Sequence, residues 1–215
     1  MNSHPIRVLI VDDHAMVRTG ISAWIDTQPD LALVGEASNG QEAVQRTGQM
    51  HPDVVLMDLV MPVMDGIAAT RAILEANPEV KVLVVTSFSE KERAVQAIRA
   101  GAAGFILKDT TPQEMLEAIV SVSRGRPWLS PDLTRLLFED PLNGGHSPEG
   151  EAMTDREHVV LLLVAQGLAD LEIAERLVIS KSTVRYHLNN ILSKLHLENR
   201  TQAALYAIRT GLVKF

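Results

Sequence analysis

The alternation of short aliphatic runs with helix-like segments constrains the fold of this chain most. The runs are IRVLIV (6–11), LALVG (31–35), DVVLM (53–57), KVLVV (81–85) and GFIL (104–107). Their length and composition are typical of strands buried on both faces of a sheet. The helix-like segments are 15–27, 40–50, 66–76, 90–100 and 112–124. Strict alternation predicts an α/β domain, a flavodoxin-like doubly wound parallel sheet of five strands in the order 2-1-3-4-5.

The pattern changes after Arg124. The stretch PLNGGHSPEGE (141–151) is rich in Gly and Pro and is typical of a linker, while a short helix is expected after Ser130. Beyond it only helical signals remain. We therefore predict a first domain over 1–125, a linker over 126–152 that is partly helical and then flexible, and a small all-α domain over 153–215.

Charge is distributed unevenly along the 215 residues, which carry a net charge of −7. Residues 1–125 hold 10 Lys and Arg against 16 Asp and Glu, whereas residues 153–215 hold 8 against 6. The front half is therefore acidic, and the weakly basic back half suits a polyanionic partner.

Composition excludes several classes of protein. The chain has no Cys, so disulfides and thiolate metal sites are excluded, and its seven His are scattered without the spacing of a zinc site. No apolar run has the length of a membrane span, and the N-terminus has no signal-peptide pattern. These features favour a cytoplasmic protein with no membrane partner.

Polar side chains follow four of the expected strands. Asp12 and Asp13 end the first, Asp58 the third, Thr86 the fourth and Lys108 the fifth. The carboxyl ends of parallel strands meet at one edge of the sheet, where ligands bind. Three carboxylates in one crevice repel each other, so a cation is needed, and all-oxygen ligands favour Mg²⁺.

A carboxylate beside Mg²⁺ and a Lys can attack a phosphoryl group and form an aspartyl-phosphate. Simpler interpretations exist for each residue taken alone. Asp12 and Asp13 could cap the next helix, Thr86 could be an ordinary strand-end hydroxyl, and Lys108 could be a surface residue. Agreement among four strand ends favours the phosphoryl site.

The motifs VDDH, MDLVMPVMDG, VVTS and AGAAGFILKD resemble the receiver domain of two-component response regulators over residues 6–124. The resemblance implies that Asp58 is the phosphoacceptor. It also implies that Asp13 and Asp58 bind Mg²⁺ directly, Asp12 mainly through water, and Val60 through its backbone carbonyl. The partner that it implies is a sensor histidine kinase.

By the same resemblance Thr86 and Lys108 contact the phosphoryl group, and Phe105 occupies the position of an aromatic switch. Plain core packing is an equally good interpretation of Phe105. Asp109 follows Lys108 where many receivers have Pro, which leaves the geometry of that peptide open.

The capping residues and apolar periodicity of the back half predict four helices. TDRE (154–157) is a capping box that opens a helix ending near Ala165, and ADLEIAERL (169–177) is the second helix. Ser180 is expected to cap a third helix over 181–195, and Asn199 a last one that ends at Gly211. The third helix has an apolar face formed by Val184, Leu188, Ile191 and Leu195. Its opposite face carries Lys181, Ser182, Arg185, Tyr186 and Asn189.

TDRE, LLLVAQGL, EIAERL, ISKSTVRYHLNNILSKL and NRTQAALYA resemble the LuxR-type helix-turn-helix of the NarL/FixJ subfamily. The resemblance implies that the third helix enters the major groove of double-stranded DNA and that the last helix carries a dimer contact. By this resemblance, the residues expected to read base edges are Arg185, Tyr186 and Asn189. Lys181 and Ser182 lie on the same DNA-facing side, whereas Thr183, His187 and Lys194 are assigned to phosphate contact or helix packing.

One departure from the LuxR-type pattern occurs in GLADLEIA, where Ala169, Asp170 and Leu171 replace a hydroxyl cap, Asn and Lys. The missing Lys removes one DNA backbone contact, and Asp170 is expected to take over the capping of the second helix.

These features together predict a phosphorylation-activated transcription factor that dimerises on activation and binds paired DNA half-sites. One alternative is a phosphohydrolase that uses Asp58 as a turnover nucleophile, but such enzymes usually need a second acid where Val60 stands. The other alternative is a receiver that controls a protein partner through its helical tail. The basic face of the third helix disfavours it, and we expect no dedicated enzymatic activity.

Overall fold

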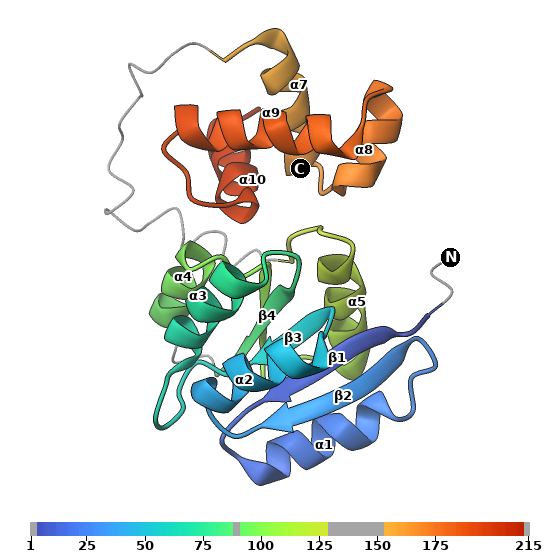
Figure 1. The fold of residues 1–215 in the computed structure, drawn as a ribbon, viewed down its shortest axis with the longest axis vertical. Helices are drawn as coiled ribbons and strands as arrows, with labels where there is room; N and C mark the ends of the chain where they lie inside the picture. Colours follow the sequence, from blue (N-terminus) through green and yellow to red (C-terminus); the bar gives the residue numbers. More distant parts are fainter. Residues whose placement is uncertain (1–3, 88–90, 129–152, 213–215) are drawn as a thin grey trace.

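The computed structural model describes residues 4–87, 91–128 and 153–212, and Figure 1 shows their arrangement. The front half forms one five-stranded parallel sheet in the order β2-β1-β3-β4-β5. Its strands are β1 (Ile6–Val11), β2 (Leu31–Ala37), β3 (Val54–Met57), β4 (Lys81–Thr86) and β5 (Gly104–Leu107). The predicted fold class and strand order are confirmed.

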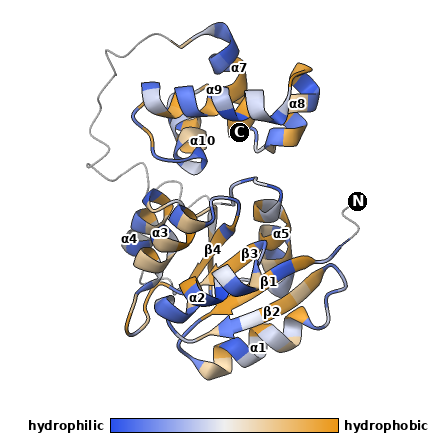
Figure 2. Ribbon diagram, in the orientation of Figure 1, coloured by the Kyte–Doolittle hydropathy of each residue, from blue (hydrophilic) through white to orange (hydrophobic). Residues whose placement is uncertain are grey.

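Helices cover both faces of this sheet. They are α1 (Ala15–Ile25), α2 (Gly40–Met50), α3 (Gly66–Ala76), α4 (Lys91–Arg99) and α5 (Pro112–Ser123). Alternate residues of β1 enter different cores: Val8 packs with residues of α1 and α5, and Leu9 with residues of α2 and α3. Figure 2 shows the apolar strands between these helices.

Helices α2 and α5 each begin with a side-chain cap. The Asn39 side chain accepts a hydrogen bond from the Glu42 N–H, and Thr111 forms a capping box with Glu114. Each bond satisfies a backbone donor that the first turn of a helix leaves without an intrahelical partner.

The back half is all helical among the residues described. It contains α7 (Asp155–Ala165), α8 (Asp170–Leu177), α9 (Lys181–Lys194) and α10 (Arg200–Arg209) around one apolar core. The capping box of Thr154 and Glu157 and the caps Ser180 and Asn199 are confirmed.

The expected capping role of Asp170 is wrong. The N-cap of α8 is Ala169, whose N–H donates to the Glu172 carboxylate at 2.7 Å. Asp170 instead lies 2.6 Å from the Arg200 guanidinium. A charged partner on α10 therefore holds this carboxylate away from the backbone of α8.

The predicted linker is only partly described. Residues 126–128 pack against the front half, because Trp128 forms a β-bridge with Gly104 and joins the core beneath α1 and α5. The helix expected after Ser130 lies outside the described residues. The domain boundaries proposed from the sequence stay predictions.

The two halves are docked against each other, with α10 above the end of α4 (Figure 1). The Asn199 amide donates to the Ile98 carbonyl at 2.9 Å, and the Thr201 hydroxyl donates to the Ala102 carbonyl at 3.2 Å. Leu205 of α10 is buried in the same apolar cluster as Ile98 and Phe105. Polar and apolar contacts thus join the two domains. Over the described residues, the helices are too short or too polar to cross a membrane.

Candidate functional site

Side chains that follow β1, β3 and β5 meet at the carboxyl edge of the sheet, where the topology places the expected crevice. Lys108, just past β5, places its ammonium 2.7 Å from Asp12 Oδ2 and 3.1 Å from Asp58 Oδ2. Both carboxylates are buried, with 3% and 4% of Asp12 and Asp58 exposed. Three strands therefore bring one cation and two carboxylates into direct contact, as the parallel topology predicts.

Asp13 and His14 complete an acidic cluster. One ligand atom from each of Asp12, Asp13, His14 and Asp58 lies within 4.8 Å of the others. Carboxylate oxygens converging in this way fit a hard divalent cation. The cluster is of the kind that binds Mg²⁺, because three neighbouring carboxylates repel one another and a divalent cation would offset that repulsion.

Burial changes the protonation equilibria in the crevice. Desolvation raises the pKa of Asp58, and the nearby Asp12 charge raises it further, although Lys108 acts in the opposite direction. Desolvation lowers the pKa of Lys108, but hydrogen bonding to Asp12 and the charge of Asp58 raise it overall. The Lys108 ammonium therefore stays charged, whereas the ionised form of Asp58 is destabilised.

The backbone after β3 fixes the position of Asp58. The Asp58 N–H donates to the Val11 carbonyl at 2.9 Å, and the Gly66 N–H donates to the Leu59 carbonyl at 3.1 Å. A Cβ on Gly66 would lie 2.0 Å from the Asp58 carbonyl oxygen, so only glycine fits there. Val60 is 44% exposed beside the crevice.

Two further predicted residues lie inside the fold. Thr86 is fully buried at the end of β4, next to the crevice. Phe105 is 2% exposed and packs with Leu59, Val84 and Ile98. Core packing of Phe105 is therefore observed, and its role as a switch stays a prediction.

Sequence reasoning missed His14. The Nδ1 of its ring lies 2.7 Å from Asp13 Oδ1, and its backbone N–H donates to Asp12 Oδ1 at 2.8 Å. His14 is the N-cap residue of α1 but makes no side-chain cap. The only signal in the sequence is its place directly after the two acids in VDDH.

The outward face of α9 carries the predicted DNA-facing side chains. Val184, Leu188 and Ile191 are buried in the core. The exposed residues of the helix include Lys181, Ser182, Arg185, Tyr186 and Asn189, and Thr183 is half-buried. The amphipathic pattern read from the sequence thus places the polar face correctly.

Two of the predicted DNA contacts are engaged within the protein. The Lys194 ammonium lies 2.9 Å from the buried Glu157 carboxylate. The Arg185 guanidinium lies 2.8 Å from Glu79 of the front half and 3.3 Å from Asp170. Glu79 was not among the sequence-derived candidates, because it stands before β4, at the edge of the sheet remote from the strand ends that carry the crevice.

Comparison with known proteins agrees with this geometry. Residues 8–120 match the family model of the response regulator receiver domain, and residues 151–207 match that of bacterial regulatory proteins of the luxR family. The transcriptional regulatory protein LiaR of Bacillus subtilis (strain 168) is 43% identical over 209 residues, covering 97% of this chain and 99% of LiaR. The response regulator protein VraR of Staphylococcus aureus (strain Mu3 / ATCC 700698) is 41% identical over the same shares.

A crystal structure of the response regulator ChrA from a heme-sensing two-component system has 34% identity and a TM-score of 0.54, covering 97% of this chain and 99% of ChrA. The chain therefore belongs to the response regulators that join a receiver domain to a LuxR-type output domain. It is a two-component response regulator of the NarL/FixJ subfamily that acts as a DNA-binding transcriptional regulator, similar to LiaR and VraR.

Proposed function

We propose that a sensor histidine kinase phosphorylates Asp58 and that this converts the protein from a docked form into a DNA-binding homodimer in the cytoplasm. The observation that carries the proposal is the Asp58 carboxylate, buried among acids with the Lys108 ammonium at 3.1 Å. A buried nucleophile beside one fixed cation suits phosphoryl transfer, in which negative charge must be neutralised.

Within this mechanism the Asp58 carboxylate forms a bond to phosphorus as the bond between phosphorus and the donor breaks. Lys108 neutralises charge on the phosphoryl oxygens, and the Thr86 hydroxyl donates a hydrogen bond to one of them. Asp12, Asp13, Asp58 and the Val60 carbonyl would hold Mg²⁺, which supplies further charge neutralisation when bound.

The docked arrangement restrains DNA binding. Arg185, the main candidate for base recognition, is held by the Glu79 carboxylate, which takes the place that a base edge or phosphate would occupy. The face of α10 around Leu205, which we assign to the dimer contact, is buried against the receiver. Release of the output domain would free both surfaces.

Phosphorylation must act over a distance, because docking uses the opposite edge of the sheet. Lys81 and Gly104 begin β4 and β5 at the docked edge, whereas Asp58 follows the last residue of β3. One continuous apolar cluster connects the two edges, from Leu59 beside Asp58 to Leu205 of α10. Repacking of this cluster is the physical route that we propose for the coupling.

On DNA, Arg185, Tyr186 and Asn189 are proposed to read base edges. Lys181, Ser182 and Thr183, near the N-terminus of α9, are proposed to contact the backbone. The sequence resemblance also suggested Lys194 as a phosphate contact. The ion pair between Lys194 and Glu157 instead supports a role in helix packing. We therefore leave Lys194 out of the proposed set of DNA contacts.

The test compares wild type with Asp58→Asn, which keeps the volume of the side chain but removes the nucleophile. With a small phosphodonor and Mg²⁺, wild type should become labelled and bind selected DNA as a dimer, whereas the variant should remain unlabelled and weakly bound. Labelling and DNA binding are followed by phosphoprotein gel and gel shift. Labelling of a folded Asp58→Asn protein would refute the assignment of the phosphoacceptor.

A further inference from the structure

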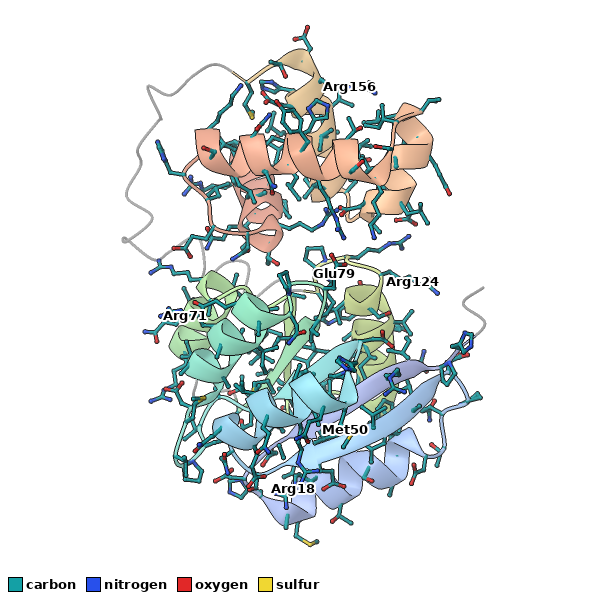
Figure 3. The ribbon with its side chains drawn as sticks, viewed as in Figure 1. Arg18, Met50, Arg71, Glu79, Arg124 and Arg156 are labelled. Carbon is teal, nitrogen blue, oxygen red and sulfur yellow. The ribbon has the colours of Figure 1, made fainter. Side chains whose placement is uncertain are left out.

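A cavity of about 580 Å³ lies between the two domains at the edge of the sheet opposite Asp58. Its walls come from α3, the start of β4, the end of α4, the segments before β5 and after α5, and the first turn of α10. Its size is typical of small-molecule sites, which are common at domain interfaces. Figure 3 shows Arg71 on α3 and Glu79 at the junction between the two domains.

The cavity is cationic. Four of its lining residues are basic and two are acidic: Arg71, Lys81, Arg99, Arg200, Glu75 and Glu198. The receiver and the output domain both contribute, since Lys81 begins β4 and Arg200 begins α10. A negatively charged molecule here would contact both domains at once.

The ionic network beside the cavity lacks one negative charge. Glu79 pairs with Arg185, and Asp170 pairs with both Arg185 and Arg200. The negative charges of these two carboxylates are thus already paired with two guanidinium groups. The Lys81 ammonium interacts electrostatically with the same two carboxylates, but among the described residues this side chain forms no hydrogen bond and no ion pair.

Two groups at the cavity, the Lys81 ammonium and the Arg200 Nε, are incompletely compensated. Burial lowers the pKa of Lys81, and the charges of Arg185 and Arg200 lower it further, although Glu79 and Asp170 act in the opposite direction. The Arg200 Nε is buried and has no hydrogen-bond partner within the described part of the chain. An uncompensated cation in a partly buried place costs free energy that an anionic ligand can offset.

We propose that this cavity binds a small phosphate-bearing anion between Lys81 of the receiver and Arg200 at the start of α10. The first turn of α10 also lines the cavity, and backbone N–H groups at helix starts favour anions. The site exists only when the domains are docked, so the anion stabilises the docked form and opposes DNA binding. In this respect the inference rests on the docking described under the proposed function.

The first test is a calorimetric titration of the full-length protein with inorganic phosphate and, separately, with glycerol phosphate. EDTA and constant ionic strength exclude effects of Mg²⁺ and of salt. The variant Lys81→Met removes the cavity charge, and Arg93→Ala is the matched control, because Arg93 is exposed on α4 and is not among the residues that line the cavity.

Saturable binding is expected in wild type and Arg93→Ala and should be at least tenfold weaker in Lys81→Met. Tighter binding of glycerol phosphate would identify a phosphomonoester as the ligand, and tighter or equal binding of phosphate would identify the free ion. Absence of saturable binding, or equal binding by wild type and Lys81→Met, would overturn the proposal.

Thermal unfolding gives a second, independent readout. Without phosphate, Lys81→Met should unfold at the same temperature as wild type or higher, because an uncompensated charge has been removed. With phosphate, the unfolding temperature of wild type should rise while that of Lys81→Met stays constant. A variant less stable than wild type in the absence of phosphate would show that Lys81 already has a partner and would refute the site. Neither readout involves DNA or Asp58 phosphorylation, so a failure here is distinguishable from a failure of the proposed function.

Discussion

The two edges of the receiver sheet carry opposite chemistry. At the carboxyl edge, Asp12 and Asp58 contact one ammonium group and Asp13 lies beside them, so three carboxylates share one Lys and the crevice is short of positive charge. At the amino edge, the cavity lined by Lys81 and Arg200 is short of negative charge. The first edge therefore suits a metal and a phosphoryl group, and the second suits an anion.

The difference between the edges lies in how their groups are assembled. The crevice uses residues of one domain, held by neighbouring strands whose spacing is fixed. The cavity uses residues of two domains and exists only while these domains are docked. The crevice can therefore act as a permanent input site, whereas the amino edge reports whether the output domain is docked.

The largest effect is expected from a change in the backbone at the carboxyl edge. Gly66→Ala should destabilise the receiver by more than about 3 kcal/mol or prevent folding, because the new Cβ would overlap the Asp58 carbonyl. Gly48→Ala is the control, since a Cβ there meets nothing within 4 Å and α2 should gain roughly 0.5–1 kcal/mol. Chemical denaturation measures both, and similar stabilities of the two variants would contradict the close approach at Gly66.

The next effect concerns two basic residues of α9. Arg185→Ala should weaken specific DNA binding by about 1–3 kcal/mol if Arg185 reads a base. Lys194→Ala should instead lower the free energy of unfolding, by roughly 1–3 kcal/mol, because the buried Glu157 loses its partner. Gel shifts with specific and random DNA, together with denaturation curves, separate the two roles. If Lys194→Ala left stability unchanged but reduced binding to all DNA, the phosphate contact proposed from the sequence would be correct.

A smaller effect follows from the raised pKa of Asp58. Because the folded-state pKa lies above the unfolded value, the ionised side chain destabilises the fold at neutral pH, and protonation removes this cost. In Mg²⁺-free buffer, Asp58→Asn should be more stable than wild type at pH 7, by on the order of 1 kcal/mol. The advantage should fade as the pH falls through the folded pKa of Asp58 towards its unfolded value. Thermal melts at several pH values test this, and a pH-independent difference would contradict the buried charge as its cause.

The smallest effect is expected at the amino edge. Glu79→Gln weakens the contact with Arg185, a largely exposed ion pair worth about 0.2–1 kcal/mol. Unphosphorylated Glu79→Gln should therefore bind DNA up to severalfold more tightly than wild type. Glu117→Gln is the matched control, because Glu117 is exposed on α5, does not line the cavity and is not an ion-pair partner of Arg185. Gel shift at low salt is the measurement, and unchanged or weaker DNA binding by Glu79→Gln would mean that Glu79 does not mask Arg185.

The sequence alone determined which residues meet at the carboxyl edge of the sheet. Strand and helix periods define five parallel units, and parallel strands must deliver Asp58, Thr86 and Lys108 to the same edge. The same holds for the polar face of α9 and for the caps at Thr154, Ser180 and Asn199, because helical periodicity and capping act over a few residues of one segment.

Only the tertiary structure decided which residues of the output domain contact the amino edge of the sheet. Glu79 and Arg185 are 106 residues apart in the chain, and Thr201 and Ala102 are 99 apart. No local period or cap encodes such pairs, because they depend on how one folded domain packs on another. The role of Asp170 changed for the same reason: the sequence around it resembles a helix start, but the nearby Arg200 guanidinium attracts its carboxylate more strongly than a neutral backbone N–H does.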